Sequence, residues 1–266
     1  MGRKRRNPQE DSRQERKTEG KAKEFVRVQA LTEGQRKYIC TIKDSIITFC
    51  VGPAGSGKTL IPVGLGLQSL IAKGSTTQRI VIMRPVKEAC DEKIGFLPGD
   101  LDEKMSPWAA PLVDNMKEFL NDKQIKLLFH ERRIVIVPLA FARGRSLNDS
   151  FIILDEAQNC SKKQMLMAVT RIGRNSKMVI NGDVSQSDDH SIINGLSDAM
   201  ERLRGIGGIG FAELRPEDIV RNPLISHIIE RYEQSDTKPS NGNGNGNGSG
   251  NRIAPISADT IFLRQG

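Results

Sequence analysis

The chain has 266 residues, which is enough for one α/β domain with a well-filled core and additional tails. Apolar residues make up only 37% of it, so we expect the deficit to lie in disordered ends. The net charge is +8, and the sequence contains neither the ~20 consecutive apolar residues of a membrane span nor the apolar stretch of a signal peptide. These features argue against contact with a membrane and predict a cytoplasmic protein.

The first segment, residues 1–23, is strongly basic. It holds nine Lys and Arg residues and four acidic residues, a net charge of +5, and it is almost devoid of apolar side chains. Such a segment cannot bury enough surface to fold alone. Two interpretations remain open: an arm that neutralises nucleic-acid phosphates, or a solvated tail that aids solubility.

The second segment, residues 24–235, is the predicted folded body, in which short apolar runs alternate with longer amphipathic stretches. Strands are predicted at residues 45–51, 79–84, 133–138, 151–155, 177–181 and 208–214. Helices are predicted at about 57–73, 108–120, 161–173, 192–204 and 223–234. Most of the strand sequences are apolar without alternation, which is typical of strands buried on both faces of a sheet. The alternation predicts an α/β fold, a mostly parallel sheet with helices on both faces.

Four cysteines occur in this body, at positions 40, 50, 90 and 160. They show neither CxxC spacing nor a neighbouring histidine cluster, so a zinc site and a disulfide framework are not indicated. We expect Cys40, Cys50, Cys90 and Cys160 to be small core residues in a reducing compartment.

The strongest motif is GPAGSGKT at residues 52–59, which matches the P-loop pattern GxxxxGK[ST] between a predicted strand and a predicted helix. Its glycines allow a tight turn, and successive N–H groups and the positive end of the following helix can then surround phosphate oxygens. The Lys58 ammonium can reach the β- and γ-phosphates, and the Thr59 hydroxyl can ligate Mg²⁺. The predicted nucleotide-binding residues are Gly52, Pro53, Ala54, Gly55, Ser56, Gly57, Lys58 and Thr59.

A second motif, FIILDEAQ at residues 151–158, is an apolar strand that ends in two acids. Asp155 is expected to hold Mg²⁺ directly or through water, and Glu156 to polarise the attacking water. An Asp-Glu pair also suits a helix N-terminus for electrostatic reasons alone. Together with the P-loop, however, the pair favours ATP hydrolysis.

A third motif, NGDVSQ at residues 181–186, follows the next predicted strand. Asp183 and Gln186 are candidates to sense the γ-phosphate or to position water. Asn-Gly-Asp is also ordinary turn chemistry, so a purely local role stays open.

Two segments follow the body. Residues 236–251 consist largely of alternating Asn and Gly and are predicted to form a flexible linker. Residues 252–266 become apolar again, as in a peptide that docks on another protein or subunit, although a frayed terminus with incidental apolar residues has the same composition.

Five strings together resemble the PhoH-like family of P-loop ATPases, which occurs in bacteria and phages and is named for induction by phosphate starvation. They agree with it in order and spacing over residues 25–234: GPAGSGKT, RPVKEACDEKIGFLPGDLDEKMSPW (84–108), ARGRSLNDSFIILDEAQN (142–159), TRIGRNSKMVINGDVSQSD (170–188) and EDIVRNPLISHIIERYE (217–233). The resemblance implies a RecA-like core related to superfamily-one helicases.

The resemblance also implies site residues outside the P-loop. A glutamine upstream of the loop reads the adenine edge in that group, and Gln35 stands in the corresponding position, which favours ATP over GTP. An arginine usually neutralises charge on the transferring phosphoryl group, and the candidates are Arg143, Arg145 and Arg221, of which Arg145 and Arg221 are preferred. Arg84 resembles a helicase residue that contacts nucleic acid.

The expected oligomer is a ring. Related helicases close ATP between two RecA-like lobes, and this chain has length for one, so a second copy must supply the arginine. Head-to-tail contacts of this kind close into rings, and we expect a hexamer here.

The sequence therefore predicts a Mg²⁺-dependent ATPase that couples hydrolysis to remodelling of RNA or single-stranded nucleic acid. The alternative is a nucleotide-dependent assembly switch that recruits a protein partner through residues 252–266.

Overall fold

The computed structural model describes residues 25–85, 101–184 and 194–220, with the backbone alone for 101–108. The chain divides into two units after Asn222, and all described residues belong to the first unit. Several predictions therefore lie outside the described residues. They concern the basic arm 1–23, the helix at 223–234, the linker 236–251, the tail 252–266, and the residues Cys90, Gln186 and Arg221.

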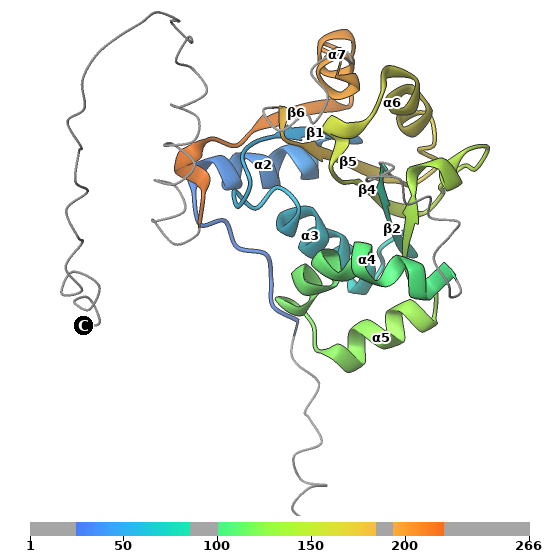
Figure 1. The fold of residues 1–266 in the computed structure, drawn as a ribbon. Helices are drawn as coiled ribbons and strands as arrows, with labels where there is room; N and C mark the ends of the chain where they lie inside the picture. Colours follow the sequence, from blue (N-terminus) through green and yellow to red (C-terminus); the bar gives the residue numbers. More distant parts are fainter. Residues whose placement is uncertain (1–24, 86–100, 185–193, 221–266) are drawn as a thin grey trace, which may run out of the picture. The chain divides into compact units, whose positions relative to one another are not determined.

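The described residues form a six-stranded sheet in which every pair of neighbouring strands is parallel (Figure 1). The strand order is β3-β2-β4-β5-β1-β6. The strands are β1 (Ile47–Val51), β2 (Arg79–Arg84), β3 (Ile134–Pro138), β4 (Ser150–Leu154), β5 (Lys177–Gly182) and β6 (Ile209–Glu213). All six predicted strands are present, each within two residues of its predicted bounds.

Helices cover both faces of the sheet, as Figure 1 shows. One face carries α2 (Glu33–Asp44), α3 (Leu60–Ile71), α4 (Leu101–Lys117) and α5 (Asp122–His130), and the other carries α6 (Lys162–Val169) and α7 (Gly195–Arg202). Three short 3₁₀ helices complete the described elements, η2 (Leu139–Ala142), η3 (Ala157–Asn159) and η5 (Pro216–Asp218). The predicted α/β fold with helices on both faces is confirmed.

The helix predictions were wrong in three places. Helices α2 and α5 were not predicted, although Thr32 caps α2 and Asn121 forms a capping box with Gln124 at the start of α5. The helix predicted at 108–120 was also started too late, just after Pro107, whereas α4 begins at Leu101 and continues through that proline. Proline is usual in the first helical turn and costly further inside, so its position pointed to a later start.

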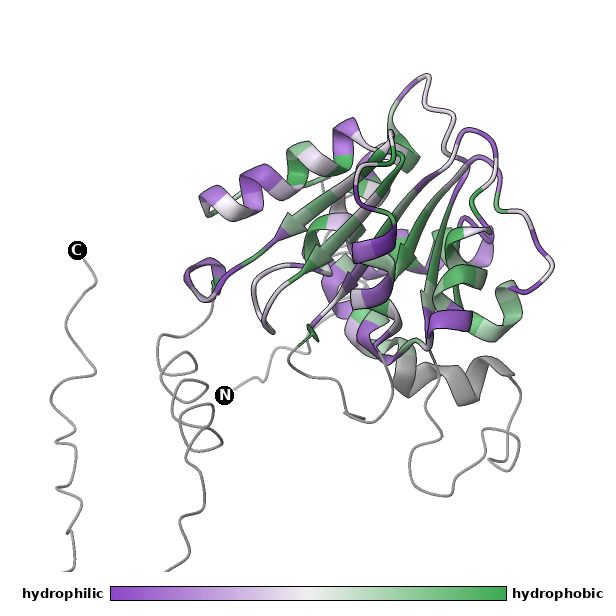
Figure 2. Ribbon diagram, turned by 90° about the horizontal axis from the view of Figure 1, so that it is seen from above, coloured by the Kyte–Doolittle hydropathy of each residue, from purple (hydrophilic) through white to green (hydrophobic). Residues whose placement is uncertain are grey.

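The four inner strands provide the core, which explains their apolar sequences. Every residue of β4 is buried, whereas the edge strands β3 and β6 have half-buried residues. Alternate residues of the inner strands pack into two clusters, one on each face, and Figure 2 shows the apolar strands between the more polar helices. None of the helices in the described ranges is long and apolar enough to cross a membrane.

The cysteines differ in exposure, which corrects the prediction that all are core residues. Cys50 and Cys160 are buried, and Cys40 is exposed on the polar side of α2. Burial raises the pKa of both Cys50 and Cys160 to about 12, because a thiolate is poorly solvated there.

Only Cys40 of these three is therefore expected to react readily with a thiol reagent at pH 8. A raised pKa keeps the buried thiols protonated far above neutral pH, and the thiolate is the reactive form. The measurement is labelling with Ellman's reagent in a Cys90→Ser background, where one fast equivalent is expected and three after denaturation. Three fast equivalents in the folded protein would contradict the described core.

Candidate nucleotide-binding site

The motifs meet because all six strands point the same way, so their carboxyl ends share one edge of the sheet. The P-loop follows β1, the Asp-Glu pair follows β4, and Arg84 ends β2. Strand β5 lies between β1 and β4 and ends at Asn181 and Gly182. Polar groups from four strands are thus brought to one place.

The backbone of the loop explains its glycines. Gly55 and Gly57 have φ angles of 84° and 90°, which side chains other than glycine rarely adopt. Gly52 is needed for a different reason, since a Cβ atom there would lie 2.8 Å from the Cβ and the carbonyl oxygen of Leu214. The loop N–H groups of Gly55, Gly57, Lys58 and Thr59 donate to no backbone carbonyl within the described ranges. They are therefore available to phosphate oxygens at the N-terminus of α3.

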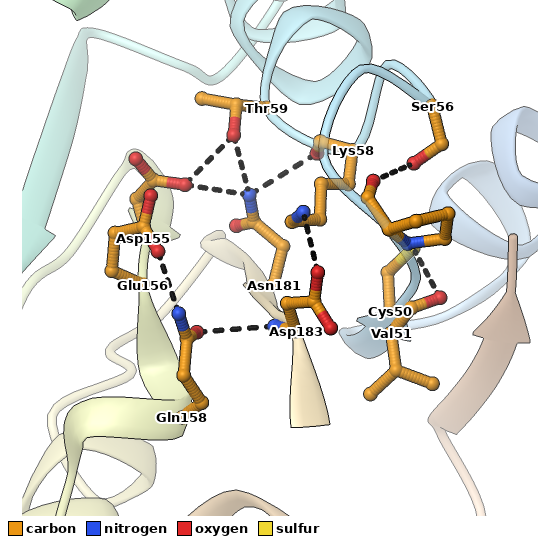
Figure 3. Close-up of polar contacts among 11 residues, drawn as sticks. Cys50, Val51, Ser56, Lys58, Thr59, Asp155, Glu156, Gln158, Asn181 and Asp183 are labelled. Carbon is orange, nitrogen blue, oxygen red and sulfur yellow. Dashed lines mark hydrogen bonds and ion pairs between the residues drawn. The ribbon is translucent and has the colours of Figure 1, made fainter. Parts of the chain in front are cut away.

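The oxygen ligands expected for Mg²⁺ lie side by side at the end of this loop (Figure 3). The Thr59 hydroxyl donates a hydrogen bond of 2.8 Å to Oδ1 of Asp155, whose side chain is only 1% exposed. The described residues contain no cluster of three or more His, Cys, Asp and Glu side chains. Two protein oxygens beside a phosphate site fit Mg²⁺, which keeps several waters and takes the rest of its shell from substrate phosphates.

Arg84 occupies the other oxygen of the same carboxylate. Its Nε and Nη2 atoms lie 2.8 and 2.5 Å from Oδ2 of Asp155, and its side chain is 13% exposed. The helicase resemblance pointed to nucleic acid as the partner of Arg84. The structure places this guanidinium on the predicted metal ligand, and contact of Arg84 with nucleic acid stays a prediction.

A chain of contacts links the P-loop lysine to the predicted catalytic acid. The Lys58 ammonium lies 3.9 Å from Oδ2 of Asp183, an ion pair too long for a hydrogen bond. The N–H of Asp183 donates to Oε1 of Gln158 at 3.1 Å, and Nε2 of Gln158 donates to Oε2 of Glu156 at 2.7 Å. Glu156 itself has the left-handed φ of 56°, an uncommon backbone state that is often found at functional sites.

Replacing Gln158 by leucine is expected to lower the free energy of unfolding by about 1–3 kcal/mol, because it leaves the buried N–H of Asp183 without its acceptor. Urea unfolding measures this loss. Gln78→Leu, at an exposed glutamine, is the matched control and should change stability by less than about 0.5 kcal/mol. Equal stability of the two variants would show that the hydrogen bonds of Gln158 do not contribute to the free energy of unfolding.

Gln35, predicted to read adenine, is buried and hydrogen-bonded to backbone groups. Its Oε1 accepts from the N–H of Leu31 at 2.9 Å, and its Nε2 donates to the carbonyl of Ser56 at 3.0 Å. Through the bond to the Ser56 carbonyl, Gln35 thus connects α2 to the P-loop. Recognition of adenine by this amide stays a prediction.

The arginine candidates lie away from the loop where they are described. Arg143 and Arg145 are exposed in the segment between η2 and β4. Arg145 lines a pocket of about 840 Å³ with Arg79, Lys117 and Arg132, next to the edge strand β3. No residue of the P-loop lines that pocket. Gln186 and Arg221 lie outside the described residues.

Sequence reasoning missed three features of this edge: the bonds of Asn181, the bridge through Gln158, and the pairing of Arg84 with Asp155. One signal was present. Asn181 is a polar residue closing the apolar strand KMVIN, and a buried polar group at a strand end requires partners.

A parallel α/β sheet with a GxxxxGKT loop after β1 and an acidic pair after β4 defines a P-loop nucleotide-binding protein. The family model for PhoH-like proteins matches residues 27–233, and the chain belongs to this family.

Relatives agree with this assignment. The PhoH-like protein of Bacillus subtilis is 43% identical over 210 residues, covering 79% of this chain and 65% of the relative. That of Synechocystis is 42% identical over 210 residues, covering 79% and 63%. Protein PhoH of Escherichia coli is 36% identical over 206 residues, covering 76% and 57%. The chain thus matches somewhat less than two thirds of the length of these relatives.

Proposed function

We propose that this protein binds ATP and Mg²⁺ at the P-loop, hydrolyses the ATP, and couples hydrolysis to remodelling of RNA or single-stranded nucleic acid. One observation carries the proposal: Lys58, Thr59, Asp155 and Glu156 converge on one edge of the sheet within a connected network of contacts. Lysine, hydroxyl and paired carboxylates beside an anion-binding loop are the groups that phosphoryl transfer to water requires.

Each group has a task in binding. The loop N–H groups and the Lys58 ammonium hold the phosphates, and Lys58 exchanges Asp183 for the β- and γ-phosphate oxygens. Thr59 and Asp155 are the protein ligands of Mg²⁺, with Asp155 acting directly or through water. The bound ion would supply neutralisation of charge that develops between the β- and γ-phosphates.

Glu156 is the proposed general base. Its Oε2 is held by Gln158, whereas its Oε1 has no hydrogen-bond partner within the described ranges and is the oxygen to which water can donate. Glu156 takes a proton from this water as the water oxygen bonds to the γ-phosphorus. The bond from that phosphorus to the β–γ bridging oxygen breaks, and ADP leaves with the electron pair.

The arginine that neutralises the transition state is proposed to come from a neighbouring copy in a homo-oligomeric ring, of which a hexamer is our proposal. Arg145 lies in a pocket without P-loop residues, so it suits a role in the site of another subunit. Arg221 is the second candidate. Such head-to-tail contacts are heterologous and close into rings.

The nucleic-acid role is supported by the helicase-like motifs and by the basic segment 1–23. Lys and Arg there can neutralise phosphates and release counterions, which makes binding sensitive to salt. The same feature predicts weak sequence preference, because phosphate contacts carry no base information.

The test is the rate of ATP hydrolysis by the purified full chain with and without single-stranded RNA and DNA, each at two salt concentrations. Stimulation by nucleic acid that weakens with salt supports the coupled ATPase. Hydrolysis indifferent to both polymers contradicts the coupling and favours the alternative, a switch whose nucleotide state controls a partner bound by residues 252–266. A variant that lacks residues 252–266 then tests this alternative, which predicts that the variant no longer binds the partner.

A further inference from the structure

Asn181 contacts both proposed metal-binding residues, Thr59 and Asp155, through its side chain. It lies on β5, directly between the P-loop strand β1 and the strand β4 that precedes Asp155, and its side chain is fully buried. Its Nδ2, which carries two hydrogens, lies 2.8 Å from Oδ1 of Asp155, 3.1 Å from the Thr59 hydroxyl and 3.2 Å from the Lys58 carbonyl, so two of these three acceptors share one N–H (Figure 3). One amide thus contacts both proposed cation ligands and the loop that carries one of them.

The orientation of this amide is set by its surroundings. A carboxylate, a hydroxyl and a carbonyl face the nitrogen, and the reversed amide would place its oxygen against the negative Asp155 oxygen and the Lys58 carbonyl. The amide nitrogen must therefore point to these three acceptors.

This orientation decides which way the Thr59 hydroxyl points. Because Asn181 donates to the Thr59 oxygen, the hydroxyl hydrogen is directed to Oδ1 of Asp155, with which it forms the 2.8 Å bond. A hydroxyl oxygen has two lone pairs, so one remains for a cation. Asn181 thus leaves Thr59 in the state that a hard cation such as Mg²⁺ requires of an oxygen ligand.

The oxygen atom of the same amide also indicates that a group binds beside it. Oδ1 of Asn181 is buried and accepts no hydrogen bond from any described residue, and no dashed line reaches it in Figure 3. A buried acceptor of this kind is rare unless a bound group satisfies it. Water brought in with a hydrated cation has the O–H donors that this oxygen lacks.

We propose that Asn181 is the residue that positions Thr59 and Asp155 for Mg²⁺ and, through its unpaired oxygen, holds a water of the loaded site. It acts through the two ligands and is a positioning residue. The proposal rests on the proposed function in that it assumes a nucleotide bound with Mg²⁺ at this edge of the sheet. It adds a specific determinant of metal binding outside the P-loop and the Asp-Glu pair.

The test separates metal binding from nucleotide binding and needs no hydrolysis. The affinity of the full chain for a fluorescent ADP analogue is measured with Mg²⁺ and with EDTA, in the wild type and in Asn181→Leu, whose side chain has similar size but no polar atoms. The Mg²⁺-dependent gain in affinity is expected to fall about 10–100-fold, as for other partners of metal ligands, with the EDTA value unchanged within about twofold.

Two further variants complete the test. Thr48→Val alters another fully buried polar residue, on β1 away from the loop, and should keep the whole Mg²⁺ effect. Asn181→Ser keeps one donor and should give an intermediate loss, and it serves as the test variant if Asn181→Leu does not fold.

Three results would count against the inference or its basis, and they can be told apart. Equal losses with Mg²⁺ and with EDTA would mean that Asn181 only supports the fold of the P-loop. An unchanged Mg²⁺ effect in both Asn181 variants would overturn the inference alone. If the affinity of the wild type for the ADP analogue did not depend on Mg²⁺, the proposed function would instead be overturned.

Discussion

Replacing Lys58 by alanine is expected to lower the affinity for ATP by about 10–100-fold and to abolish measurable hydrolysis. Lys58 is the only P-loop side chain with a positive charge, and a charge-assisted hydrogen bond contributes about 1.5–3 kcal/mol. The affinity is measured by titration with a fluorescent ATP analogue, and hydrolysis by phosphate release.

A second effect of this substitution needs a control. Lys58→Ala removes the cation beside Asp183, whose side chain is 5% exposed, so some stability should be lost together with binding. Adding Asp183→Asn removes the carboxylate charge and should restore stability without restoring binding. If stability and ATP affinity returned together, Lys58 would act by supporting the fold and not by holding phosphate.

Replacing Glu156 by glutamine is expected to lower kcat by about 10²–10⁴-fold, the usual contribution of a general base. ATP binding should persist, since the substitution leaves the P-loop, Thr59 and Asp155 unchanged. Gln158 Nε2 can still donate to the new amide oxygen, so the local structure should be retained. Single-turnover hydrolysis and ATP titration on the same preparation give the two quantities.

The matched comparison for Glu156→Gln is Glu131→Gln, which removes a carboxylate from the exposed end of α5 and should leave both quantities unchanged. Retention of wild-type kcat by Glu156→Gln would remove Glu156 from the mechanism. The next candidate would then be Asp183, which belongs to the same chain of contacts.

The strands were predictable because a strand that is buried on both faces has a continuous run of apolar residues. The run FIIL (151–154) is apolar throughout since β4 lies in the middle of the sheet with helices on each side. Once the strands are parallel, the positions of the P-loop and of Asp155 follow, because both stand directly after strands. Sequence therefore predicted which groups share the edge.

The contacts among these groups were not predictable, because they depend on strand order. Nothing in the spacing of residues 155 and 181 says that β5 lies between β1 and β4, and this order brings Asn181 against Thr59 and Asp155. The same holds for Arg84, which reaches Asp155 only because β2 and β4 are neighbours.

The missed helices have a local explanation. Helix α2 buries Gln35, Tyr38 and Ile42 along one stripe, but most of its other residues are polar, so its apolar signal is weak. Its capping residue Thr32 was the stronger sign, and the hydroxyl of Thr32 also bonds the buried Asp218 of η5. Thr32 thus helps to hold the segment that carries Gln35 against the end of the described chain.

The most direct test of the account is the release of phosphate from ATP by the purified protein, measured with Mg²⁺ and with EDTA beside Lys58→Ala and Glu156→Gln. We predict turnover that requires Mg²⁺ and disappears in both variants while ATP binding is lost only in Lys58→Ala. Turnover that survives in both variants, or a wild type that binds ATP with Mg²⁺ and never releases phosphate, would contradict the assignment of this site as an ATPase centre.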